Sequence, residues 1–186
     1  LLLSDDGSAG AITTVATHQR NVYLGTDNGT LRHYHLFEDA PEYMLISEVP
    51  CGKQPVTKIL VLEAIERALV LCGGVASIYT LPELSTCNLG KLRDVNDLLQ
   101  VSTIPNSTTN NSKLSQSLVE VKVVVLSANK IRLILFSKDA LKLLSDINYA
   151  NGIRGASIPS ATSTICLVAN KNNYDMVDLN QLRKIG

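Results

Sequence analysis

Tryptophan is absent from this sequence of 186 residues, and all aromatic side chains together make up only 4%. So few aromatic residues argue against the stacking platforms that bind single-stranded nucleic acids. The lack of tryptophan also excludes the Trp-Asp signature of WD-type repeats. No apolar run approaches the length of a membrane-spanning helix, and the opening LLL is too short for the core of a signal peptide.

Charge of one sign is not in excess. Lys and Arg together number 17, as do Asp and Glu, so the net charge is zero, which suggests neither nucleic acid nor a membrane surface as a direct partner. The distribution is uneven, because residues 1–50 hold seven acidic and two basic side chains. The simpler interpretation is a mildly polarised surface. The functional alternative is that one edge attracts a basic partner.

Cysteine pairs with metal-binding spacing are lacking. The four cysteines are Cys51, Cys72, Cys87 and Cys166, and none forms a C-x-x-C pair. Cys72 and Cys166 lie within apolar runs, LVLC and ICLV. These two are therefore predicted to be buried, reduced thiols of a cytosolic protein.

Histidine is also scarce, with only His18, His33 and His35. His33 and His35 are two residues apart and share one face of a predicted strand, a spacing that a metal site could use. No third ligand is evident, and no zinc-binding or catalytic-triad pattern accompanies them. We interpret them as partly covered strand histidines. The alternative is an enzyme whose central pocket is lined by His33 or His35.

Two pairs of adjacent carboxylates, Asp5 with Asp6 and Glu38 with Asp39, occur in loop-like surroundings. Carboxylates act as acid and base only when they are held and partly buried, so we interpret both pairs as solvated. No phosphate-binding loop is present either, because the LGTDNG stretch leads into another strand and not into a helix. The sequence therefore predicts no catalytic, cofactor-binding or metal-binding residues.

The clearest feature that is present is a β-hairpin pattern. In VYLGTDNGTLRHYHL, residues 22–36, an apolar run meets a Gly-Thr-Asp-Asn-Gly turn cluster and an alternating run follows at once. We attribute Gly25 and Gly29 to turn geometry with positive φ, and the same logic applies to Gly73 and Gly74 in CGGV.

This hairpin recurs along the chain. Comparable strand, turn and strand patterns occupy residues 56–81, 118–147 and 153–179. If Leu24, Leu71, Leu133 and Val168 are equivalent, the repeat averages about 48 residues, near the length of a propeller blade. The pattern predicts an all-β propeller of antiparallel blades around a shared axis, of which the chain supplies roughly four. Four irregular units do not usually close a ring, so residues 1–186 are expected to be part of a larger propeller.

Other segments receive separate assignments. LRDVNDLLQV, residues 92–101, could form about two helical turns, whereas residues 62–69 are predicted to turn between two strands. Residues 102–117, STIPNSTTNNSKLSQS, are rich in Ser, Thr and Asn and are predicted to be a flexible polar loop between strands. In the second and third strands, both faces are expected to be covered, so the side chains predicted to be buried are Leu71, Cys72, Ile78, Cys166 and Val168.

The hairpin and the segment after it resemble a known family, the citron homology (CNH) domain. The residues that match its first hairpin are Tyr23, Gly25, Thr26, Gly29, Leu31 and Tyr34. The residues that match the following segment are Lys58, Ile59, Leu69, Leu71, Cys72, Tyr79, Leu81, Pro82 and Leu84. ERALVLCG and YMLISEV carry a narrower resemblance to the N-terminal domains of fungal CORVET subunits and their metazoan counterpart. The match is good over residues 11–90.

The resemblance implies a propeller of about seven blades in the complete domain, placed before an α-solenoid in a membrane-tethering complex. It also implies a non-catalytic role in vacuolar protein sorting, with an endosomal Rab GTPase and other tethering subunits as partners. Its implied location is the cytoplasm, peripheral to the endosome or vacuole membrane. The alternative is a CNH interaction domain of a signalling kinase or Rho exchange factor. No Rab-contacting residues can be carried over.

Overall fold

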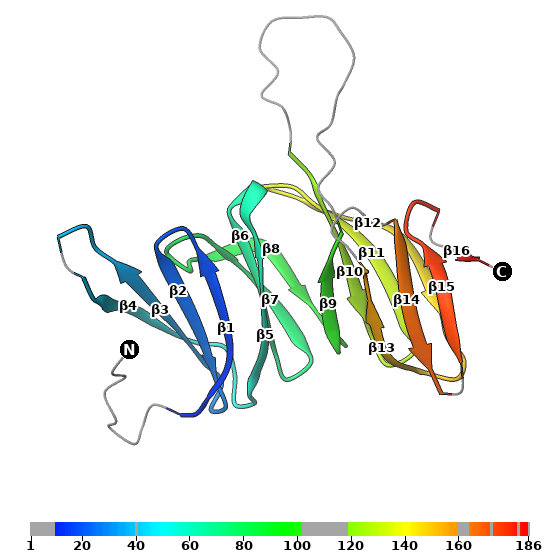
Figure 1. Cartoon of the computed structure of the whole chain (residues 1–186), viewed down its shortest axis with the longest axis horizontal. Helices are drawn as coiled ribbons and strands as arrows, with labels where there is room; N and C mark the ends of the chain where they lie inside the picture. The colour runs from blue at the N-terminus through cyan, green and yellow to red at the C-terminus, as the bar shows by residue number, and fades with distance from the viewer. Residues whose placement is uncertain are drawn as a thin grey trace, which may run out of the picture. The chain divides into compact units, whose positions relative to one another are not determined.

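The computed structural model describes residues 10–39, 41–101, 119–159, 164–171, 173–181 and 183–185. Within these residues the chain is all-β apart from one three-residue 3-10 helix, η1 (Glu63–Ile65). The strands form four antiparallel sheets, and each sheet consists of four strands that follow one another along the chain. Figure 1 shows this succession of sheets from the N-terminal to the C-terminal end of the chain. The predicted fold class is confirmed.

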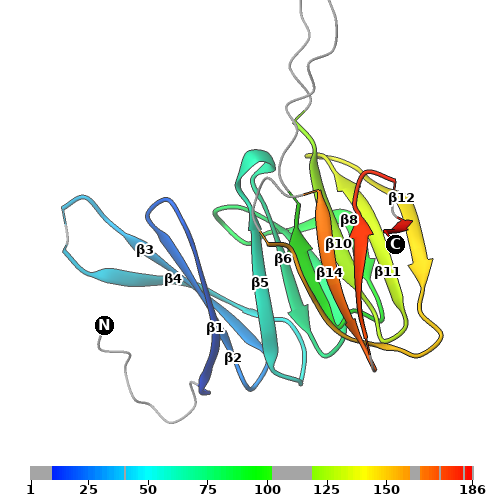
Figure 2. The same cartoon turned by 45° about the vertical axis from the view of Figure 1, so that its right-hand side comes forward.

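The first compact unit, Leu1–Arg93, contains the first two sheets. The strands of the first sheet are β1 (Ile12–His18), β2 (Asn21–Thr26), β3 (Thr30–Leu36) and β4 (Tyr43–Pro50). The strands of the second sheet are β5 (Val56–Leu62), β6 (Arg67–Cys72), β7 (Val75–Thr80) and β8 (Thr86–Leu92). Figure 2 shows β1 to β4 as one twisted sheet.

The second compact unit, Asp94–Gly186, contains the other two sheets. The strands of the third sheet are β9 (Asp97–Gln100), β10 (Val121–Leu126), β11 (Lys130–Phe136) and β12 (Leu141–Asn148). The strands of the fourth sheet are β13 (Ile153–Ser157), β14 (Ile165–Asn170), β15 (Tyr174–Asp178) and β16 (Arg183–Ile185). Residues 102–117, which we predict to be a flexible loop, lie between β9 and β10 in the sequence and outside the described residues.

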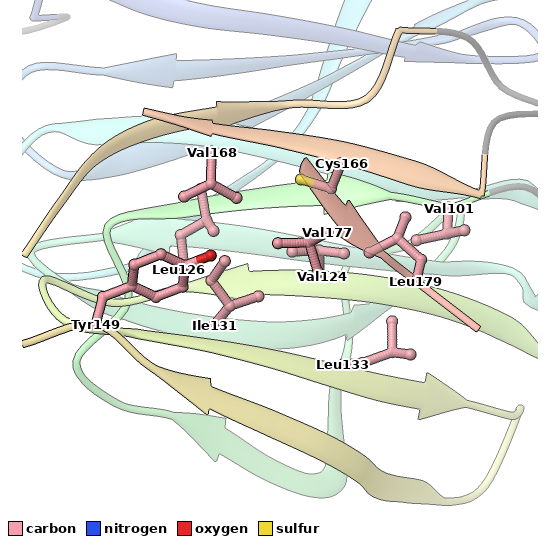
Figure 3. Packing of buried hydrophobic residues seen from close by; sticks show 10 residues of the cluster. All are labelled: Val101, Val124, Leu126, Ile131, Leu133, Tyr149, Cys166, Val168, Val177 and Leu179. Carbon is pink, nitrogen blue, oxygen red and sulfur yellow. The ribbon is translucent and has the colours of Figure 1, made fainter. Parts of the chain in front are cut away.

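Each unit has its own apolar core between its two sheets. In the first unit, Tyr23 and Leu31 from the first sheet pack with Val70 and Tyr79 from the second. In the second unit, β10 and β11 face β14 and β15, and Figure 3 shows these side chains converging. The buried residues of that cluster are Val101, Val124, Leu126, Ile131, Leu133, Tyr149, Cys166, Val168, Val177 and Leu179.

Burial follows strand position within a sheet. Every side chain of β6, a second strand, is buried, whereas most of β4, a fourth strand, is exposed. The burial predicted for Leu71, Cys72, Ile78, Cys166 and Val168 is confirmed, with exposed fractions from 0% to 7%. An inner strand has a hydrogen-bonded neighbour on each side, so its side chains are covered. An outer strand has only one such neighbour, so more of its side chains face the solvent.

Three of the four glycines that we attribute to turns lie in hairpin turns. Gly29 ends the β2–β3 turn with φ of 84°, while Gly73 and Gly74 form the β6–β7 turn with φ of 56° and 76°. Successive positive φ values are those of the two-residue hairpin turn that suits twisted strands. Gly25 is different, and our attribution of it to a turn is wrong. It lies within β2, where an added Cβ would stand 2.6 Å from both Thr14 Cγ2 and Val56 Cγ1.

The helix considered for residues 92–101 is also wrong. Leu92 ends β8, a bend with Asp94 at φ of 55° follows, and Asp97 begins β9. β9 pairs antiparallel with β10, with Leu98 opposite Val125. The third sheet therefore begins at β9, so Leu133 lies in a third strand and is not equivalent to Leu24, which lies in a second strand. By contrast, residues 62–69 turn between β5 and β6 as predicted, through η1.

Candidate functional site

The histidines singled out in the sequence lie around one asparagine. Asn21, at the start of β2, is opposite His35 in the β2–β3 ladder. Its Oδ1 lies 2.7 Å from His33 Nε2 and 2.8 Å from His35 Nδ1, and its Nδ2 donates to the backbone carbonyl of His18 at 3.1 Å. Because the amide nitrogen donates to a carbonyl, the amide oxygen accepts, and both imidazoles donate to it.

Aromatic rings close two sides of this cluster. The Tyr23 and His33 rings are stacked with their centroids 5.0 Å apart, and Tyr23 Oη donates to the Pro82 carbonyl at 3.1 Å. The Phe37 ring meets His35 edge-on at 4.8 Å. His33 is only 4% exposed, which places the imidazole within the packed interior of the first unit.

Burial favours the neutral forms of His33 and Tyr23 near pH 7. Burial lowers the pKa of His33, and the adjacent His35 lowers it further, while Glu83 acts in the opposite direction. Burial also raises the pKa of Tyr23 to about 12, and Glu83 adds to this increase. His33 Nδ1 is buried without a hydrogen-bond partner among the described residues, so a proton there would be unsatisfied.

The third sheet offers an internal comparison for His33. His33, which is opposite Tyr23 in the β2–β3 ladder, corresponds to Leu133, which is opposite Val124 in the β10–β11 ladder. In both strands an arginine comes directly before this residue. Leu133 is 2% exposed and belongs to the apolar core. The polar cluster therefore occupies a position that another sheet of the same chain fills with an apolar side chain.

Burial makes the thiols of Cys51 and Cys166 poor nucleophiles. All four cysteines are free. Burial raises the pKa of Cys166 to about 11 and also raises that of Cys51, whose Sγ lies 3.7 Å from Tyr79 Oη. Since the thiolate is the reactive form of cysteine, these two side chains are inert near neutral pH.

The remaining candidates are surface features. Glu38 is largely exposed and pairs with Arg20 at 2.9 Å, and Asp39 is exposed, as expected for solvated carboxylates. Asp5 and Asp6 lie outside the described residues. Within the described part of the chain, no group of three or more His, Cys, Asp or Glu residues could hold a metal ion, and no helix is long and apolar enough to cross a membrane.

Several of the residues that match the family pattern, in the hairpin and in the segment after it, prove to be structural. Tyr23, Leu31, Tyr79, Leu81 and Leu84 all belong to the buried core of the first unit. Sequence reasoning missed Asn21 as the residue that joins the histidines. The available signal was the hairpin register, which places the first residue of β2 opposite the sixth residue of β3.

Comparison with known proteins decides the family. The family model described as the VPS3 N-terminal domain matches residues 9–186. The chain belongs to the VPS3 N-terminal domain family. Among curated proteins it is similar to vacuolar protein sorting-associated protein 3 of Saccharomyces cerevisiae, with 25% identity over 171 residues. That match covers 90% of this chain but only 15% of the yeast protein.

Solved structures bear on the fold. The chain is similar to the AfRom2 CNH domain, with a TM-score of 0.59 and 16% identity over 96% of this chain and 55% of that chain. It is also similar to the computationally designed Ika4 protein, with a TM-score of 0.53 and 13% identity over 97% of this chain and 95% of that chain. The CNH resemblance and the antiparallel propeller-blade fold predicted from the sequence are confirmed.

Proposed function

We propose that this VPS3 N-terminal domain is a non-catalytic interaction module of a CORVET-like tethering complex in vacuolar protein sorting. The observation that carries the proposal is the family match, which extends over nearly the whole chain. The similarity to the yeast sorting protein points the same way, although the chain spans about a seventh of that protein's length. The protein would act at the cytoplasmic surface of the endosome or vacuole, held there through its partners.

The finer proposal is that the domain contributes to recognition of an endosomal Rab GTPase and to contacts with other tethering subunits. The character of the described side chains supports a binding role. His33 is buried, neutral and hydrogen-bonded, and the thiols of Cys51 and Cys166 are protonated. Binding to proteins, in contrast to catalysis, needs none of these groups to react. The likeness to the AfRom2 CNH domain, at 16% identity, informs the fold and gives the signalling alternative no separate support.

Complementation in yeast tests the sorting role. The complete gene that encodes this chain is expressed in Saccharomyces cerevisiae cells that lack vacuolar protein sorting-associated protein 3, and secretion of a soluble vacuolar hydrolase is measured. We expect the complete protein to reduce this missorting and the protein without residues 9–186 to fail. Equal rescue by both proteins, at equal abundance, would contradict a role of this domain in sorting.

A further inference from the structure

The outer strand β4 differs from the last strands of the other three sheets. Four consecutive apolar side chains of β4 are exposed: Tyr43 at 36%, Met44 at 54%, Leu45 at 49% and Ile46 at 49%. Among the described strands β4 is hydrogen-bonded only to β3, so its other edge presents backbone N–H and C=O groups to any strand that approaches. An exposed apolar edge of this kind favours pairing with another chain.

Basic residues protect the corresponding edges elsewhere in the chain. Lys91 lies in β8, Lys142 lies in β12, and Arg183 and Lys184 lie in β16. A charged side chain, lysine above all, on an outer strand discourages another strand from pairing there. β4 contains no lysine or arginine, and its one charged residue is Glu48. The last strands of three sheets therefore carry this protection, and β4 lacks it.

The exposed side chains of β4 lie on both faces of the sheet. Met44 is opposite His35, whereas Tyr43 and Leu45 are opposite Leu36 and Tyr34, on the alternate face. A single layer packed on the sheet could cover only one of these faces. A strand added at the edge would present its own side chains alternately to both faces.

Charge around β4 indicates what kind of strand fits. Glu48 pairs with Arg32 at 2.6 Å, while Asp39 and Glu42 are exposed and form no ion pair with the residues that the structure describes. The edge is therefore acidic at its start, next to Tyr43. We propose that β4 is a docking edge for an extended segment of a partner protein, in which alternate residues are apolar and lysine or arginine residues flank them. This inference rests on β4 itself and is independent of the tethering role.

Fluorescence anisotropy with a labelled peptide tests the proposal directly. The probe is acetyl-KKVTVTVKK-amide, and its controls are the same peptide with glutamate in place of lysine and a peptide with proline in place of the central valine. Proline removes a backbone donor, so it blocks strand pairing. We expect saturable binding of the lysine peptide, with both controls weaker by about tenfold or more. Equal binding of the lysine and glutamate peptides, or no binding of the lysine peptide, would overturn the proposal.

A matched pair of variants locates the binding. Leu45→Lys introduces a basic residue on β4. Leu143→Lys is the control on β12, where Leu143 is similarly exposed at 52%. Both side chains are about half exposed, so both variants are expected to fold. We expect Leu45→Lys to weaken binding of the lysine peptide by about tenfold and Leu143→Lys to leave it unchanged. Equal affinities of Leu45→Lys and the unchanged protein would contradict docking at β4.

Two further measurements distinguish docking of a partner at β4 from binding at another strand and from self-association. Amide hydrogen exchange in the unchanged protein should slow in β4 when the lysine peptide binds, and this readout does not depend on any variant. Protection confined to strands other than β4 would overturn the proposal.

Sedimentation velocity tests self-association. A dimer of the unchanged protein that Leu45→Lys dissociates would assign β4 to a second copy of this chain and would contradict docking of a different partner.

Discussion

Leu71 shows at the scale of a single residue what stabilises a sheet. It lies in β6, a strand whose six side chains are all buried, and is itself 2% exposed. Replacing it with alanine removes apolar contacts and leaves a cavity, so Leu71→Ala is expected to lower the free energy of unfolding by roughly 2–5 kcal/mol. Urea denaturation measures this loss. Leu143→Ala, at an exposed apolar site, is the control and should change stability by only about 0.5 kcal/mol. A loss below about 1 kcal/mol for Leu71→Ala would show that the site is not part of a rigid core.

His33 should make the stability of the first unit depend on pH. The pKa of His33 in the folded protein is lowered from 6.5, mainly by burial, whereas the unfolded chain keeps the ordinary value. As the pH falls through about 6.5, the unfolded state therefore binds a proton that the folded state does not, and stability decreases. Unfolding free energies measured between about pH 7.5 and pH 5.5 should fall, and His33→Leu should reduce that slope.

Leucine is a reasonable substitute for His33, because Leu133 occupies the matching position in the third sheet. The slope with pH, and not the absolute stability, is the diagnostic quantity, since the variant also loses the hydrogen bond to Asn21. His35 and Glu83 affect the same proton and remain in both proteins. An identical pH slope in the two proteins would mean that His33 does not stay neutral in the folded state.

At the scale of strands, Gly25 is where sheets of the first unit come close together. It lies in β2, and a Cβ there would stand 2.6 Å from side-chain atoms of Thr14 in β1 and Val56 in β5. Gly25→Ala is therefore expected to cost roughly 1–3 kcal/mol through overpacking. Gly155→Ala in β13 is the control, because a Cβ there meets nothing within 4 Å. Thermal melts of both variants test this expectation, and equal melting temperatures would rule out the close approach.

Strands with a strong turn signal could be predicted from the sequence, and those without one could not. The β2–β3 and β6–β7 hairpins are marked by Gly29 and by Gly73 with Gly74, whose positive φ values few other residues adopt easily. β9 has no such marker. Its apolar residues fit helical spacing, and pairing with β10, a partner more than twenty residues away, determines its conformation. The spacing error that placed Leu133 in a second strand follows from this single missed strand.

The histidine cluster could be predicted only in part, for a similar reason. Alternation along β3 places His33 and His35 on one face, and the structure confirms that they lie together. The residue that joins them, Asn21, comes from a different strand, and its role depends on the register across the hairpin. Local pattern determines which face a side chain occupies, whereas contacts between strands depend on register.

At the scale of the whole molecule, the chain consists of four successive antiparallel sheets. The match to the VPS3 N-terminal domain family extends over all four of them, across residues 9–186. The repeat length in the sequence predicts a propeller, and the family match supports the sorting role proposed above. The partner-binding surface could not be predicted, because exposure of β4 depends on which strand lies at the edge of its sheet.

Biolayer interferometry with an endosomal Rab GTPase tests the central claim most directly. The complete subunit that contains this chain is immobilised beside the same subunit without residues 9–186, and the Rab is supplied with either a GTP analogue or GDP. We predict binding of the GTP-analogue form to the complete subunit, much weaker binding of the GDP form, and loss of the difference when residues 9–186 are absent. Binding that is unchanged by the deletion, or equal for the two nucleotides, would contradict the claim that this domain contributes to Rab recognition.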